Sequence, residues 1–88
     1  MNRREHLLTI LGEECSELHK ETCKILRFGY NSEKRGRLQA EFNEILALVQ
    51  MLANEGISIY EQKHLIQDKK EKVEAMLLES QALGTLDE

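Results

Sequence analysis

Apolar residues recur every three or four positions along most of the chain, which is the spacing of an amphipathic helix. The first such stretch covers about residues 3–27. Its apolar stripe consists of Leu7, Leu11, Cys15, Leu18 and Ile25 or Leu26. The glycine that follows Phe28 is a natural left-handed helix cap. The pattern predicts a long first helix that ends near Gly29, followed by a polar loop from Tyr30 to Gly36.

The same spacing predicts a second helix over about residues 37–54, ended by Gly56. Its main apolar stripe consists of Leu38, Phe42, Ile45, Val49 and Leu52. A neighbouring stripe is acidic in its first half, at Glu41 and Glu44, and apolar in its second half. Because apolar residues cover so much of its circumference, we expect this helix to be the most buried of the three.

A third helix is predicted over about residues 59–82. It would open with a capping box, in which Ser58 is the N-cap and Glu61 follows three residues later. The apolar stripe consists of Ile59, Ile66, Val73 and Met76 or Leu77. The other faces carry charges of both signs, which is typical of a helix surface in contact with water.

Length and composition limit the class of protein. The 88 residues form at most one domain, residues 1–88, and a monomer of this size would be marginally stable, so we expect association. With 41% hydrophobic and 32% charged residues and no proline, the chain is predicted to be an all-α globular domain. The longest apolar run, 45–49, is far too short to cross a bilayer, and no signal-peptide pattern is present. We therefore expect a cytoplasmic protein with no membrane partner.

The two cysteines lack the spacing of a metal or redox motif. We interpret Cys15 and Cys23 as reduced thiols, with Cys15 as a small core residue. Glu61 and His64 form a single Glu-x-x-His, whereas di-iron carboxylate bundles need two on different helices. His64 is accordingly predicted to lie at the surface.

Two Glu-x-x-Glu pairs carry the candidate chemistry. Residues three apart share a face of a helix, so Glu14 pairs with Glu17 and Glu41 pairs with Glu44. Two such helices packed face to face would place four carboxylates in one pocket. Clustered, partly buried carboxylates repel one another unless a cation binds them, and Mg²⁺ or Mn²⁺ prefers oxygen ligands. Glu13 lies about 100° around the helix from Glu14 and is expected to point away.

The charge balance agrees with a localised site. The net charge is −4, and without the four paired glutamates it would be zero. The acidity can therefore belong to the site, and a nucleic-acid binder with a broad basic face is disfavoured. The basic residues near the acidic pairs either balance surface charge or, as a group, suit a polyphosphate. They are Lys20, Lys24, Arg27, Arg35 and Arg37.

The acidic motifs resemble those of a known family. The stretches Gly12-Glu13-Glu14-Cys15-Ser16-Glu17-Leu18 and Glu41-Phe42-Asn43-Glu44-Ile45-Leu46-Ala47-Leu48-Val49 resemble the all-α nucleoside triphosphate pyrophosphohydrolases, the MazG-type superfamily. The family signature is Glu-Glu-x-x-Glu on one helix and Glu-x-x-Asp on the next. Residues 4–8 and 24–29 look like those of the small stand-alone members common in phages and bacteria. The resemblance covers roughly residues 4–56.

The resemblance implies a metal site and a reaction. Glu14, Glu17, Glu41 and Glu44 would bind the catalytic Mg²⁺. A nucleoside triphosphate would be hydrolysed between its α- and β-phosphates, giving a nucleoside monophosphate and pyrophosphate. The chain departs from the family at Glu44, where Asp is usual, so the activity could be weaker or the metal preference different.

Ordinary metal-ion chemistry at such a site gives hypotheses for the roles of further residues. Glu17 is assigned to orient or deprotonate the attacking water, and Lys24 and Arg27 to stabilise the leaving pyrophosphate. Asn43 would hydrogen-bond the ligand or face solvent. Family members form homo-dimers or homo-tetramers in which paired helices complete a four-helix bundle, so the helical hairpin and third helix are expected to complete their core by homo-oligomerisation.

Two other functions stay open at this point. The chain could be a non-catalytic helical oligomerisation or interaction module, whose acidic face binds a metal or a basic partner. It could also be a regulatory nucleotide- or metal-binding domain without turnover.

Overall fold

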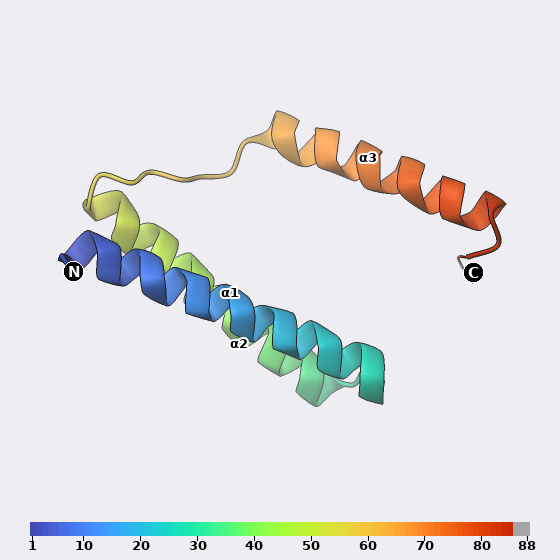
Figure 1. Ribbon diagram of the computed structural model, residues 1–88, viewed down its shortest axis with the longest axis horizontal. Helices are drawn as coiled ribbons and strands as arrows, with labels where there is room; N and C mark the ends of the chain where they lie inside the picture. Colours follow the sequence, from blue (N-terminus) through green and yellow to red (C-terminus); the bar gives the residue numbers. More distant parts are fainter. Residues whose placement is uncertain (86–88) are drawn as a thin grey trace.

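The computed structural model describes residues 1–85 and contains three helices (Figure 1). They are α1 (Arg3–Phe28), α2 (Ser32–Asn54) and α3 (Lys63–Ala82). α1 and α2 pack against each other along their length as a hairpin. The predicted all-α class, with a helical hairpin and a third helix, is confirmed. Within the described part of the chain, no helix is both long and apolar enough to span a bilayer.

The ends of α1 follow from local chemistry. The side chain of Asn2 accepts a hydrogen bond from the backbone N–H of Glu5 at 2.8 Å, which satisfies one of the free donors of the first turn. At the other end Gly29 has φ 90°, a conformation that disfavours any residue with a side chain. Its N–H still donates to the carbonyl of Ile25. The predicted end of the first helix is thus confirmed to within one residue.

The predicted loop from Tyr30 to Gly36 is wrong, because α2 begins at Ser32 instead of Arg37. Asn31 acts as the N-cap: its side chain accepts the N–H of Lys34 at 2.9 Å. This cap starts the helix early enough to include Gly36, whose low helix propensity is the smaller effect. The hairpin connection is consequently only three residues long, 29–31.

The predicted capping box at Ser58 and Glu61 is also wrong. α3 begins at Lys63, its N-cap is Gln62, and no side chain caps it. Residues 57–62 instead continue as extended chain. The reason lies in Ile57, which packs against the hairpin core and donates its N–H to the carbonyl of Leu52. Because Ile57 holds this segment against α2, the helix begins only at Lys63, after the segment has left the surface of α2.

The hydrophobic core lies at the end of the hairpin where α1 starts and α2 finishes. Leu7, Leu48 and Leu52 are buried, and Leu52 is 0% exposed. The partly buried Leu11 and Ile57 pack against them. α2 supplies two of the three buried hydrophobic side chains, in agreement with its broad apolar surface.

Cys15 is exposed, contrary to the prediction that it belongs to the core. A residue that follows Glu14 directly is rotated by about 100° around α1, which takes its side chain out of the contact with α2. The interpretation of both cysteines as free thiols agrees with the structure. His64 is exposed, as predicted.

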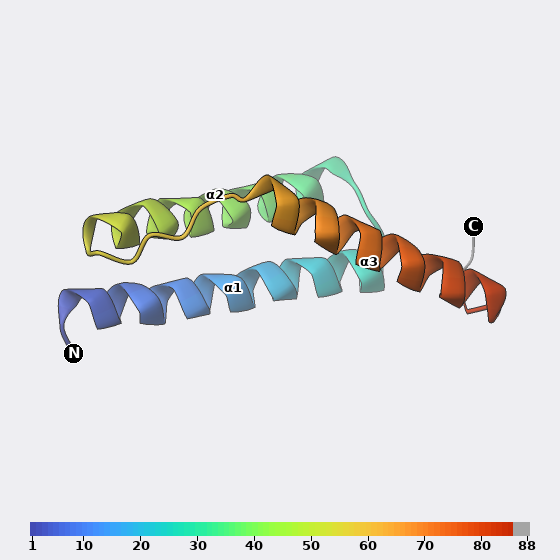
Figure 2. The same ribbon diagram turned by 90° about the horizontal axis from the view of Figure 1, so that it is seen from above.

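α3 contacts neither α1 nor α2 within residues 1–85. Figures 1 and 2 show it displaced from the hairpin and running past the end where α1 meets α2. Its apolar stripe consequently stays at or near the surface. The radius of gyration is 16.6 Å, whereas a compact chain of this length has about 12 Å. One protomer alone is therefore an open structure.

Candidate metal centre

Three carboxylates from the two hairpin helices converge in the middle of the hairpin. Glu14 comes from α1, and Glu41 and Glu44 come from α2. One oxygen from each can be chosen so that all three atoms lie within 4.8 Å of one another. Glu14 and Glu41 are half-buried and Glu44 is exposed, so the cluster opens to solvent. We refer to these three residues as the acidic triad.

The leucine core positions the acidic triad. Glu14 follows Leu11 by three residues, and Glu44 precedes Leu48 by four, so each glutamate lies one helical turn from a core leucine on the same face. Leu11 packs against the cluster that contains Leu48. The helix contact that buries the leucines therefore also brings the carboxylates close together, one helical turn away from the leucines. Glu13 is exposed, as predicted.

The proximity of the three carboxylates raises the pKa of two of them, Glu14 and Glu41. Hydrogen bonding with Glu44, and then with Glu41, favours the protonated form and raises the pKa of Glu14 from its ordinary 4.5 to about 7. Desolvation and the negative charges of the same two neighbours act in the same direction. Near neutral pH the carboxyl group of Glu14 is therefore about half-protonated.

Glu41 accepts the hydrogen bond that the protonated carboxyl group of Glu14 donates. Its hydrogen bond with Glu14 lowers its pKa, but desolvation and the adjoining carboxylates Glu44 and Glu17 outweigh that effect, and its pKa is raised. With all carboxylates ionised, the Oε2 atom of Glu41 is buried and has no hydrogen-bond donor. A buried oxygen in this position is satisfied either by a proton on Glu14 or by a bound cation.

Glu17 lies beside the acidic triad but outside the group of converging oxygens. Its Oε1 atom is 3.0 Å from the Nζ of Lys20, one turn along α1. Its charge nevertheless reaches Glu41, whose pKa it helps to raise. The structure thus brings together three of the four carboxylates that the sequence predicts, with the fourth at their edge.

Glu21 is a buried acid that the sequence analysis missed. Only 8% of its surface is exposed to solvent. One carboxylate oxygen is 3.2 Å from the Nζ of Lys24, and the other is buried and has no hydrogen-bond partner. Glu21 lies seven residues, or two turns, after Glu14 and hence on nearly the same face. Counting that spacing, instead of only the Glu-x-x-Glu pairs, would have found it.

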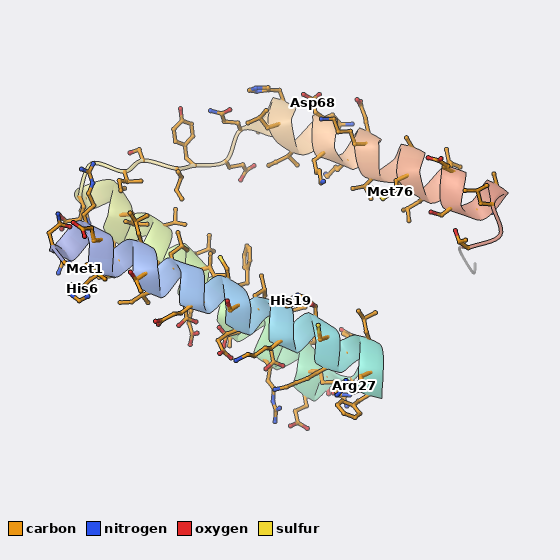
Figure 3. All side chains as sticks on the ribbon, viewed as in Figure 1. Met1, His6, His19, Arg27, Asp68 and Met76 are labelled. Carbon is orange, nitrogen blue, oxygen red and sulfur yellow. The ribbon has the colours of Figure 1, made fainter. Side chains whose placement is uncertain are left out.

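The predicted phosphate-binding residues lie farther along α1. Lys24 is ten residues from Glu14, which corresponds to about 15 Å of helix, and its amine contacts Glu21. Arg27 lies near the end of the helix, over the ring of Phe28 (Figure 3). The structure does not bring either of them to the acidic triad.

The remaining predicted side chain, Asn43, is turned along its own helix. Its Nδ2 donates to the backbone carbonyl of Gln39 at 2.8 Å. Asn43 is exposed and lies outside the group of converging oxygens.

The donor set fits a hard divalent cation. Mg²⁺ usually takes a few carboxylate oxygens and completes its octahedron with water and substrate phosphates. The acidic triad supplies three oxygens from a solvent-open site, and the unpartnered Oε2 of Glu41 is available as a ligand. Comparisons of the chain with protein-family models, with curated proteins and with solved structures gave no match. The resemblance of the acidic motifs therefore stays a prediction.

Proposed function

We propose that this chain is a Mg²⁺-dependent hydrolase that cleaves nucleoside triphosphates to a nucleoside monophosphate and pyrophosphate. One observation carries the proposal: two acidic motifs that are distant in the chain place three carboxylate oxygens within 4.8 Å of one another. The resemblance of those motifs to the all-α pyrophosphohydrolases gives the reaction class. Mn²⁺ is a chemically similar alternative ion.

Each residue of the proposed site has a defined task. Glu14, Glu41 and Glu44 hold the ion, which supplies Lewis-acid stabilisation of the phosphate charge. Water adds to the α-phosphorus as the bond to the bridging oxygen breaks, and pyrophosphate leaves. Glu17 is half-exposed at the edge of the triad and accepts the proton of the water.

Lys24 and Arg27 are proposed to act on the leaving group. Both lie on α1 beyond the triad, toward the hairpin turn. Lys24 is 46% exposed and so retains access to an anionic ligand despite its contact with Glu21. Because charge develops on the leaving group in the transition state, substitution of Lys24 by Gln should lower kcat for the nucleotide more than it raises KM. Arg27 lies farther away, and Arg27→Gln is expected to have the smaller effect.

A non-catalytic interaction module is the second candidate function. It is favoured by the position of α3, which contacts neither hairpin helix in the described chain and keeps apolar side chains at its surface. In that case the acidic triad would bind a basic partner or an ion without turnover. Metal dependence and turnover separate these functions.

Thermal melting with and without Mg²⁺ tests the metal site. At a concentration of 100 times Kd, Mg²⁺ should stabilise the native state by about 2.7 kcal/mol, relative to NaCl of equal ionic strength. Glu14→Gln and Glu41→Gln should remove most of this effect. Glu13→Gln is the matched control, because Glu13 is exposed and adjacent in sequence. Stabilisation that survives both triad substitutions would show that the ion binds elsewhere.

A panel of nucleoside triphosphates then tests the reaction. With Mg²⁺ or Mn²⁺ the expected products are a nucleoside monophosphate and pyrophosphate, and the release should depend on Glu14 and Glu41. Orthophosphate as the first product would contradict cleavage between the α- and β-phosphates. Selective Mg²⁺ binding without turnover of any nucleotide would favour the regulatory or interaction function.

A further inference from the structure

The two long sides of the hairpin differ in chemistry. Rotation of about 100° per residue makes Glu17 and Thr22 of α1 diverge by about 140°. In α2 Phe42 and Glu44 diverge by about 160°. Glu17 and Glu44 therefore lie away from the apolar side chains, whereas the half-buried Glu14 and Glu41 lie between the two sides, at the helix contact.

The apolar side contains a groove. A hollow of about 480 Å³ is lined by Leu18, Thr22, Arg35, Leu38, Gln39 and Phe42. Farther along α2 a hollow of about 290 Å³ is lined by Leu46, Val49, Ile59, Tyr60 and Glu61. We call these two hollows together the apolar groove. At its centre the side chain of Phe42 is 53% exposed, which is unusual for a phenylalanine in a folded protein whose interfaces are all covered.

α3 does not fill this groove in its own protomer. The extended segment 57–62 runs back along the hairpin, and α3 continues past the hairpin end (Figure 2). The part of α3 beyond that end has no hairpin of its own chain beside it. Two of its large apolar side chains, Met76 and Leu78, are more than half exposed, and Leu77 between them is 38% exposed.

The exposed area matches that of a protomer taken from a dimer. The chain exposes 7192 Å². A compact monomer of 10.2 kDa exposes about 5,300 Å², so the excess is about 1,900 Å². Obligate dimers bury about 1,000–2,500 Å² on each partner. Burial of the groove and of α3 against a second copy would account for this excess.

We propose that the occupant of the apolar groove is helix α3 of a second copy of this chain, in a reciprocal exchange. The groove and the apolar stripe of α3 are two unpartnered surfaces of one chain, and a two-fold dimer covers both at once. Glu44, the exposed member of the acidic triad, diverges from Phe42 by about 160° and stays open in this arrangement. The inference does not depend on the proposed activity.

Sedimentation equilibrium of the full chain tests the association. The wild-type chain is expected to be dimeric, and Phe42→Lys in the groove or Met76→Lys in α3 should each give monomers. Both side chains are more than half exposed in the protomer, so these substitutions leave the hairpin core intact. Tyr30→Lys is the matched control, since Tyr30 is 64% exposed in the hairpin connection, and this variant should stay dimeric.

Mixing the two variants tests the exchange itself. In a mixed dimer, the α3 of the Phe42→Lys chain meets the groove of the Met76→Lys chain, and both surfaces of that contact are wild type. The second contact carries both lysines, so the mixed dimer keeps one intact contact, whereas each variant alone has two disrupted ones. The mixture should therefore dimerise with a Kd at least about tenfold lower than either variant alone, which corresponds to about 1.4 kcal/mol. A monomeric wild-type chain, a dimer that survives Phe42→Lys or Met76→Lys, or a mixture that associates no better than its components would each overturn the proposal.

Discussion

The two halves of the α1–α2 contact have opposite chemistry. In the first half Leu7, Leu48 and Leu52 exclude water. In the second half the same two helices face each other with partly or fully buried carboxylates, including Glu14 and Glu21. Burial of apolar surface stabilises the first half, whereas burial of charge opposes folding in the second. The hairpin is thus stabilised by apolar packing at one end, whereas clustered carboxylates repel one another at the other end.

The largest expected effect comes from the leucine half. Leu52→Ala should lower the free energy of unfolding by about 2–5 kcal/mol, because the side chain is fully buried and its removal leaves a cavity. Urea unfolding followed by circular dichroism measures this change. Leu26→Ala is the control: Leu26 is 86% exposed, so its loss should stay within about 0.5 kcal/mol. Equal effects of the two variants would mean that the core lies elsewhere.

The second expected effect is a pH dependence that comes from the acidic half. The pKa of Glu14 is about 7 in the folded protein and ordinarily 4.5, so the folded state holds its proton more tightly. Stability from this group is fully present below about pH 4.5 and is lost as the pH rises through about 7. Without Mg²⁺, the melting temperature should therefore fall across that range, and Glu14→Gln should flatten most of the fall.

Magnesium should reverse this trend. Since the ion displaces the proton, its affinity should increase as the pH rises through 7, and binding should release protons. Calorimetry in two buffers of different ionisation enthalpy measures the release. An affinity that does not vary between pH 6 and pH 8 would contradict the assignment of Glu14 as a ligand.

A smaller effect is expected from the buried ion pair. Glu21→Met replaces a buried carboxylate, one oxygen of which has no partner, by an apolar side chain of similar size. Lys24 is 46% exposed and remains hydrated without it. We expect the free energy of unfolding to rise by about 1 kcal/mol. Glu33→Met, which breaks the exposed pair with Arg37, should change it by at most about 0.5 kcal/mol. A loss of stability in Glu21→Met would show that the carboxylate is structurally required.

The smallest expected effects come from two glycines, Gly36 and Gly29, that differ in backbone conformation. Gly36 lies inside α2, and a Cβ added there meets nothing within 4 Å. Gly36→Ala should therefore stabilise the protein by about 0.5–1 kcal/mol. Gly29→Ala meets no atom either, but φ at that position is 90°, so it should destabilise by a similar amount. Thermal melts of both variants should move in opposite directions.

The sequence predicted features that depend on local spacing. Helical periodicity and the acidic pairs were enough for the all-α class, for the hairpin and for the convergence of Glu14, Glu41 and Glu44. The predicted start of α1 was correct, but the start of α2 was wrong because the single cap residue Asn31 outweighs propensity, and the start of α3 was also wrong. The sequence analysis also missed Glu21, because a lone glutamate in an amphipathic helix normally faces solvent, although the two-turn spacing from Glu14 places it on nearly the same face.

The place of α3 could not be predicted for a different reason. Its periodic apolar residues predict a packed face but do not identify the surface that covers it. Anchoring of Ile57 to the hairpin core moves the start of the helix to Lys63 and carries it away from its own hairpin. Such an effect arises from tertiary contacts and leaves no local signal.

The start of α3 has a consequence for solution behaviour. No side chain caps its first turn, and no acidic residue lies there to favour the positive end of the helix. A helix of 20 residues without tertiary support is marginal in water, so α3 should unwind in a free chain. Ellipticity at 222 nm would then decrease on dilution while the hairpin stays intact, and protein concentration alone would decide whether this region is ordered.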